Sequence, residues 1–194
     1  MERTPVQKLA QVLKVLVLIT FVCNIITLFL VPGLVGIWAE GGVIAFSGLN
    51  PFAERSALRL AALFLAACIQ FLTRIWRYGG YCVMLTLFLW ACGICTAAIL
   101  WQGKRVLDTI LKGDPFTLGN AANLKRAAVC CFAISGAALA RLIWGFVTYQ
   151  SILPLLTYNA LFVPIFLMAG LLCMVMSALF RQAAELKAEN DLTI

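Results

Sequence analysis

The sequence predicts an all-α integral membrane protein, a helical bundle of four transmembrane helices with a further outer helical segment that is interfacial or re-entrant. The first observation behind this fold class is composition: the 194 residues are 63% hydrophobic and 12% charged, and the mean hydropathy is +1.00. Soluble domains are roughly a quarter charged. The second is that the apolar residues come in long uncharged runs. The length suits one membrane domain over residues 1–194, with no separate soluble domain.

The first span is expected at about residues 12–32. Val15–Val31 contains no charge, and Pro32-Gly33 is expected to end this helix. A cleaved signal peptide is the alternative interpretation. The apolar run is long for a signal peptide, and residues 33–39 offer a poor cleavage site, so a retained helix is favoured.

Three further spans are expected at about 81–103, 126–149 and 155–180. The second span begins with 21 uncharged residues, enough to cross a bilayer. Within the third, Ala127–Tyr149 holds a single charge, Arg141, which lies near the outer end, where its side chain can snorkel to the interface. The fourth contains Pro164, which removes one backbone hydrogen bond and is expected to kink the helix. A short turn joins the last two spans, so they are expected to be antiparallel neighbours.

The placement of lysine and arginine predicts that both termini are cytoplasmic, because basic residues favour that side of a membrane. With four crossings, ten basic residues fall on the inner side: Arg3, Lys8, Lys14, Lys104, Arg105, Lys112, Lys125, Arg126, Arg181 and Lys187. Four fall on the outer side: Arg55, Arg59, Arg74 and Arg77. The net charge of +7 then reflects this bias together with attraction to anionic lipid. No long basic run is present, so direct binding of nucleic acid is not expected.

Residues 33–80 are too apolar for an ordinary loop. Within them, Leu58–Ile75 is nearly long enough to span, yet a polar stripe recurs there at helical spacing. A helix lying in the outer interface fits this pattern and keeps both termini on one side. The alternative is a membrane hairpin formed by two segments of this stretch, which gives six crossings.

The loop over residues 104–125 is expected to begin as an amphipathic continuation of the second span. Gly113 is the expected helix C-cap, directly before Asp114-Pro115. Thr117 is expected to cap the next helix by accepting from the backbone N–H of Asn120.

The tail, residues 181–194, is expected to continue the fourth helix and then to turn at Asn190-Asp191. Its acids should face the basic residues of the loop. Leu192 and Ile194 would then pack on apolar surface of the bundle's inner end, formed by Val106, Ile110, Phe116 and Leu124.

Catalysis and metal chemistry find little support in the sequence. There is no histidine, and the four spans contain no acid. The eight cysteines lie inside apolar segments, where free thiols act as small apolar residues. Cys92 and Cys95 have the spacing of a redox or metal pair, but no second pair accompanies them. The protein is therefore not expected to be an enzyme or to carry a cofactor.

Two stretches, LKGDPFTLGNAANLKRAAVCCF and AGLLCMVMSALFRQAAELKAENDLTI, resemble a family of small bacterial membrane proteins that is catalogued only as a domain of unknown function. Members typically have four membrane helices, a Gly-x-Pro-Phe…Asn…Leu-Lys/Arg loop and a terminal Glu-Asn/Leu-Asp-Leu-Thr-Ile/Val motif. The matching positions here are Gly113, Pro115, Phe116, Asn120, Leu124, Lys125, Glu189, Asn190, Asp191, Leu192, Thr193 and Ile194. This chain has Gly119 where members often have an acid, and Gln102-Gly103-Lys104 where Glu-Leu-Arg is common.

The resemblance implies a multi-pass protein of the bacterial plasma membrane. Genes of this family often lie beside one for a small Cro/C1-type helix-turn-helix regulator, which implies a regulatory partner. We therefore expect a regulatory or sensory membrane protein whose loop and tail hold such a DNA-binding regulator. The expected partners are this regulator, the lipid bilayer and a second copy of the chain. A small transporter or efflux component is the alternative function.

Overall fold

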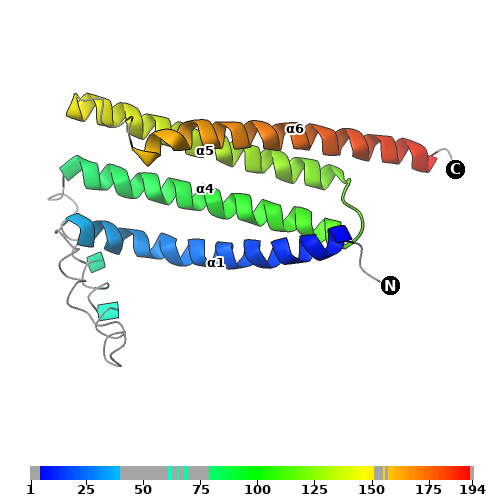
Figure 1. The fold of residues 1–194 in the computed structure, drawn as a ribbon, viewed down its shortest axis with the longest axis horizontal. Helices are drawn as coiled ribbons and strands as arrows, with labels where there is room; N and C mark the ends of the chain where they lie inside the picture. Colours follow the sequence, from blue (N-terminus) through cyan, green and yellow to red (C-terminus); the bar gives the residue numbers. More distant parts are fainter. Residues whose placement is uncertain are drawn as a thin grey trace. The chain divides into compact units, whose positions relative to one another are not determined.

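The computed structural model of the chain describes residues 5–39, 61–62, 65, 68–69, 79–150, 155 and 157–192. Four long helices hold nearly all of these residues (Figure 1): α1 (Pro5–Ala39), α4 (Gly79–Leu111), α5 (Leu118–Tyr149) and α6 (Tyr158–Leu192). Each of the four is long and apolar enough to cross a membrane. The predicted all-α class, with four helices of membrane-spanning length, is confirmed.

The first helix is longer than the sequence indicated. The expectation that Pro32-Gly33 ends it is wrong, because α1 passes through Pro32 and continues to Ala39. A proline inside a long apolar helix removes one backbone hydrogen bond, and neighbouring groups in a membrane helix can compensate for this loss. Pro164 likewise lies inside a continuous helix, α6.

The predicted outer segment lies largely outside the described residues. Within it, the isolated described residues Ala61, Ala62, Leu65, Cys68 and Ile69 are helical. The polar stripe on which the interfacial assignment rests lies outside the described part of the chain, as do residues 40–60. The choice between an interfacial helix and a membrane hairpin therefore stays a prediction.

The chain forms two compact units. The smaller comprises residues 26–91, and its buried cluster joins Val31 and Val35 of α1 to Cys82 of α4. The larger comprises residues 1–25 and 92–194, and it contains α5, α6 and the charged ends of α1 and α4. The candidate site described below lies entirely within this larger unit.

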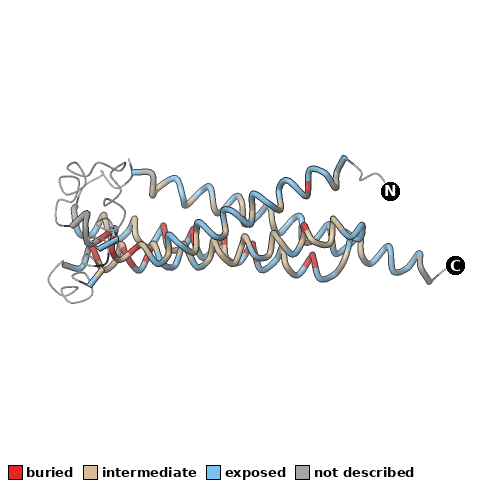
Figure 2. Tube along the Cα trace, turned by 90° about the horizontal axis from the view of Figure 1, so that it is seen from below, coloured by how far each residue is buried: buried red, intermediate tan, exposed pale blue. Residues whose placement is uncertain are grey.

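Helix α5 is the most enclosed of the four helices. One third of its most apolar stretch is buried, against 6% for α1 and α6 and 11% for α4. Its buried positions follow helical spacing and are mostly small: Asn120, Ala121, Ala127, Ala128, Cys131, Ile134, Ser135 and Ala138. Small residues allow neighbouring helix backbones to approach closely. Elsewhere exposed and half-buried surface predominates (Figure 2), as expected for helices whose outer faces meet lipid.

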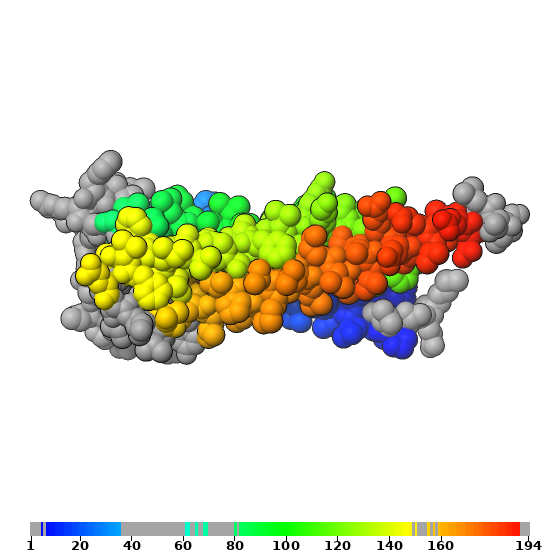
Figure 3. All heavy atoms as spheres, turned by 90° about the horizontal axis from the view of Figure 1, so that it is seen from above, coloured from blue at the N-terminus to red at the C-terminus, as the bar shows by residue number. Residues whose placement is uncertain are grey.

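Helices α5 and α6 pack as antiparallel neighbours, as the short connection predicts (Figures 1 and 3). Two hydroxyl groups tie them together. Ser135 Oγ donates to Val163 O at 2.9 Å, and Ser177 Oγ donates to Ala121 O at 2.7 Å. Lipid hydrocarbon offers these hydroxyl groups no hydrogen-bond partner, so the bonds to the neighbouring helix satisfy them.

Gly170 of α6 lies against the Phe132 ring of α5. A Cβ placed there would lie 2.6 Å from Cε1 of the Phe132 ring. By contrast, a Cβ at Gly136, on α5, would meet nothing within 4 Å. Of these two glycines, packing therefore requires Gly170 and not Gly136.

We expect Gly170→Ala to be less stable than the matched variant Gly136→Ala by about 1–3 kcal/mol, because only the former forces the Phe132 ring to move. Gly136→Ala should be neutral or slightly stabilising, since alanine favours helices by up to about 1 kcal/mol over glycine. Thermal unfolding in detergent measures both. Equal melting temperatures would show that the helices are not in close contact at Gly170.

Candidate interaction site at the charged end of the helices

Helix α4 ends in a Schellman motif. Gly113 has a φ of +84°, in the left-handed region that glycine adopts without strain. Its N–H donates to Ile110 O at 3.1 Å, and the N–H of Asp114 donates to Thr109 O at 3.2 Å. Both bonds satisfy carbonyls that the helix end would otherwise leave without partners. The predicted C-cap at Gly113 is thus confirmed.

The turn from α4 to α5, residues 112–117, is held by Asn120. This side chain is 1% exposed. Its Nδ2 donates to Pro115 O at 2.7 Å and to the hydroxyl oxygen of Thr109. The Thr109 hydroxyl in turn donates to Val106 O at 2.7 Å. One buried amide therefore links the last turn of α4, the loop and the first turn of α5.

The start of α5 is capped as the sequence predicted. Thr117 adopts an extended backbone conformation, and its hydroxyl oxygen accepts from the N–H of Asn120 at 3.2 Å. Asn120 thus contributes both its backbone N–H and its side-chain amide to fixing the loop.

The loop contacts helix α6 at two points. The rings of Phe116 and Phe180 lie 5.5 Å apart between centroids, tilted by 55°. Lys187 Nζ and Asp114 Oδ1 form an ion pair at 2.8 Å. The sequence suggested acids of the tail facing bases of the loop, and this ion pair has the opposite polarity. It is half-exposed, so its contribution to stability is at most about 1 kcal/mol.

The last part of α6, Arg181–Leu192, is a helix, which we call the α6 extension. Figure 1 shows it continuing past the start of α5. The predicted turn at Asn190-Asp191 is wrong, because both residues are helical. Turn preference is a weak local effect, whereas an established helix gains a backbone hydrogen bond with each added residue. The predicted packing of Leu192 and Ile194 lies outside the described side chains.

One face of the α6 extension combines a leucine with polar and acidic groups. Gln182, Glu185, Leu186 and Glu189 are spaced so that they share this face, and all four are exposed. Leu186 has 62% of its surface exposed. Glu185 also pairs with Arg181, one turn earlier, at 2.8 Å. We call these four residues the leucine face.

A family described as "Protein of unknown function (DUF2975)" matches residues 59–194 of this chain. The chain belongs to this family. The matched region includes the loop and the whole α6 extension, whereas α1 precedes it. No curated protein and no solved structure matches the chain.

The family motif residues divide into two groups in the structure. Gly113, Pro115 and Asn120 come together in the loop, and Phe116 reaches α6. Leu124 is half-buried, whereas Lys125, Glu189 and Asn190 are exposed. Asp191 and Leu192 are helical, while Thr193 and Ile194 lie outside the described residues.

Sequence reasoning missed several residues that complete the site. Thr109 accepts from Asn120, and Lys187 pairs with Asp114 across the loop. A third link joins α1 to α4, where Lys14 Nζ and Asp108 Oδ1 lie 2.6 Å apart. Charge is the sequence feature that could have indicated the two ion pairs, because each joins a basic residue to an acid on a different helix or loop.

Redox and metal sites would draw on the cysteines and acidic residues of the described chain. All eight cysteines are free thiols. Within the described part of the chain, no group of three or more histidine, cysteine, aspartate or glutamate side chains could hold a metal ion. The site offers a fixed loop, an exposed helix face and several charged side chains, which are the elements of a binding surface.

We expect Asn120→Ala to lower the free energy of unfolding by about 1–3 kcal/mol, because it removes two side-chain hydrogen bonds and leaves the partly buried Pro115 carbonyl and Thr109 hydroxyl without this donor. The matched control is Asn123→Ala, which truncates the same type of side chain about one turn further along α5. Thermal unfolding in detergent measures both variants. A melting temperature for Asn120→Ala equal to that of the control would contradict the assigned role.

Proposed function

We propose that this protein is a membrane-bound regulatory protein. In this proposal, the loop and the α6 extension hold a small helix-turn-helix regulator at the cytoplasmic surface of a bacterial plasma membrane. The observation that carries it is the leucine face: a large apolar side chain, 62% exposed, on a polar helix that projects past the neighbouring helix.

The support comes from three features of the site. Binding surfaces commonly have an apolar centre within a polar rim, and Leu186 has that position among Gln182, Glu185 and Glu189. The face carries two acids, which complement the basic surface that DNA-binding regulators use to contact phosphates. The fixed loop holds the base of the extension through Phe116 and Asp114, which reduces the ordering cost of binding.

Capture of the regulator tests this proposal. The full-length protein and a helix-turn-helix regulator encoded beside its gene are co-expressed, and the regulator recovered with purified membranes is quantified. We expect Leu186→Ala to weaken capture about tenfold, the effect of losing one apolar anchor. Its melting temperature should stay unchanged, since the side chain is largely exposed.

The matched control is Leu9→Ala, which removes a comparably exposed leucine from α1 near the N-terminus. Capture should survive this change. A regulator that stays soluble with the unmodified protein, or equal capture by both variants, would count against the proposal. Substrate-dependent flux in proteoliposomes without any capture would favour the transporter instead.

The proposal requires the α6 extension to be cytoplasmic, as the ten-to-four bias of basic residues indicates. Reporter fusions after Gln150 and after Ile194 should therefore lie on opposite sides of the membrane, with the second one cytoplasmic. If the reporter after Ile194 were external, a cytoplasmic regulator could not reach the leucine face.

A further inference from the structure

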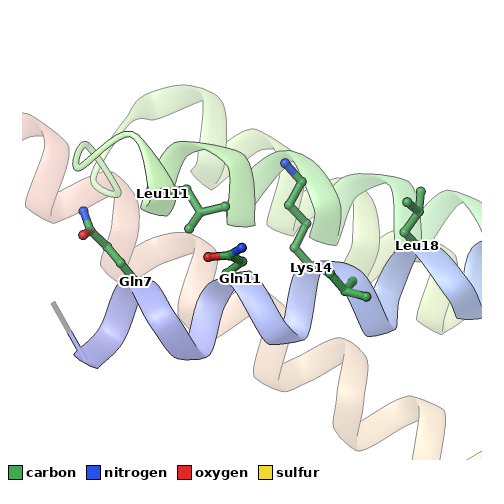
Figure 4. A pocket seen from close by; sticks show the side chains of 6 residues that line it. Gln7, Gln11, Lys14, Leu18 and Leu111 are labelled. Carbon is green, nitrogen blue, oxygen red and sulfur yellow. The ribbon is translucent and has the colours of Figure 1, made fainter. Parts of the chain in front are cut away.

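A groove lies between α1 and α4 at their charged ends. Its volume is about 390 Å³, and it is lined by Gln7, Gln11, Lys14, Val15, Leu18 and Leu111. Figure 4 shows Gln11 and Lys14 extending from α1 towards α4, with Leu111 facing them. The groove therefore has amide and ammonium groups towards the chain's N-terminus and aliphatic groups deeper along α1.

The apolar side of this groove continues along the same two helices. A much smaller hollow, of about 10 Å³, shares Leu18 and is further lined by Val17, Phe21, Leu100, Trp101 and Lys104. Phe21 and Trp101 are in ring contact, with centroids 5.8 Å apart. Together with the Lys14–Asp108 ion pair, this contact sets one antiparallel register for α1 and α4. In that register Lys104 lies at the level of Leu18, between the ion pair and the aromatic contact.

Three basic groups lie at or beside these two hollows: Lys14 lines the groove, Lys104 lines the smaller hollow, and Arg105 lies beside Trp101. Lys104 Nζ lies 4.9 Å from the centre of the Trp101 ring, and Arg105 Cζ lies 6.0 Å from it. Lys8 lines a further hollow on the same helix as Lys14. Lys14 is already paired with the carboxylate of Asp108, whereas Lys104 and Arg105 lie beside Trp101. The charge of the rim is thus complementary to an anion.

We propose that this groove binds an anionic phospholipid. The phosphate lies at Lys14 and Lys104, and an acyl chain packs on the outer surface of Leu18, Phe21 and Leu100, which is only partly covered by the protein. Three properties point to a lipid: the polar-to-apolar gradient along the helices, the net positive rim, and a tryptophan, which favours headgroup depth. Basic pockets between membrane helices recognise anionic headgroups. This inference does not depend on the proposed regulator.

Native mass spectrometry of the full-length protein in detergent tests the site. Phosphatidylglycerol and phosphatidylcholine with identical acyl chains are the probes. We expect phosphatidylglycerol to bind more tightly, and Lys104→Gln/Arg105→Gln to weaken its binding roughly 10- to 30-fold, at the strength of two basic groups near a headgroup. Phosphatidylcholine binding should change little. Circular dichroism checks folding, and Lys104→Gln alone serves if the double variant misfolds.

The matched control is Lys125→Gln/Arg126→Gln, which removes the same charge from exposed positions on α5 that do not line the groove. It should retain the preference for phosphatidylglycerol. Equal binding of both lipids would overturn the proposal, because the site would then not distinguish a headgroup's charge. Equal loss in both double variants would also overturn it, because binding would then depend on the overall charge of the protein. Competition by glycerol phosphate, which lacks acyl chains, at the same concentration would also overturn it.

Discussion

A single buried amide, the side chain of Asn120, fixes the charged end of the helices. An antiparallel connection between two membrane helices leaves backbone carbonyls exposed at the end of one and N–H groups at the start of the other. Here the connection is only six residues long, and Pro115 has no N–H to donate. Asn120 joins the loop carbonyl of Pro115 to the hydroxyl of Thr109 on the preceding helix. The amide is almost fully buried and its partners are partly buried, so removing it leaves those partners with restricted access to water.

The links to the other helices start from the segment that this amide holds. Asp108, one residue before Thr109, pairs with Lys14 of α1. Asp114, whose N–H completes the Schellman motif, pairs with Lys187 of α6. Each ion pair is partly exposed and therefore weak by itself. These ion pairs add to stability only when the loop already holds their side chains in position. One buried amide can therefore organise a surface made mostly of charged groups.

Much of this arrangement could be predicted from the sequence. Long uncharged runs identified the four helices, because hydrocarbon admits few other structures. Gly113 before Asp114-Pro115 identified the end of α4, and Thr117 identified the cap of α5, because both signals act within one turn. The partner of Asn120 could not be predicted: Thr109 is eleven positions earlier, and their contact depends on how α4 turns into α5.

The errors of prediction have a common cause. At Pro32 and at Asn190-Asp191, local preferences favoured a helix end, yet the helix continues through both. Such preferences amount to a few kcal/mol or less, and they are overridden when the flanking residues favour a long helix.

Amide hydrogen exchange tests most directly whether Asn120 holds the loop and, through it, the base of the α6 extension. The comparison is between the unmodified protein, Asn120→Ala and Lys187→Ala, each in the same detergent. The account predicts faster exchange in Asn120→Ala at Gly113 and Asp114, whose N–H groups are bonded in the Schellman motif, and also around Lys187. Lys187→Ala should affect the extension alone. Unchanged exchange at Gly113 and Asp114 in Asn120→Ala would contradict the account.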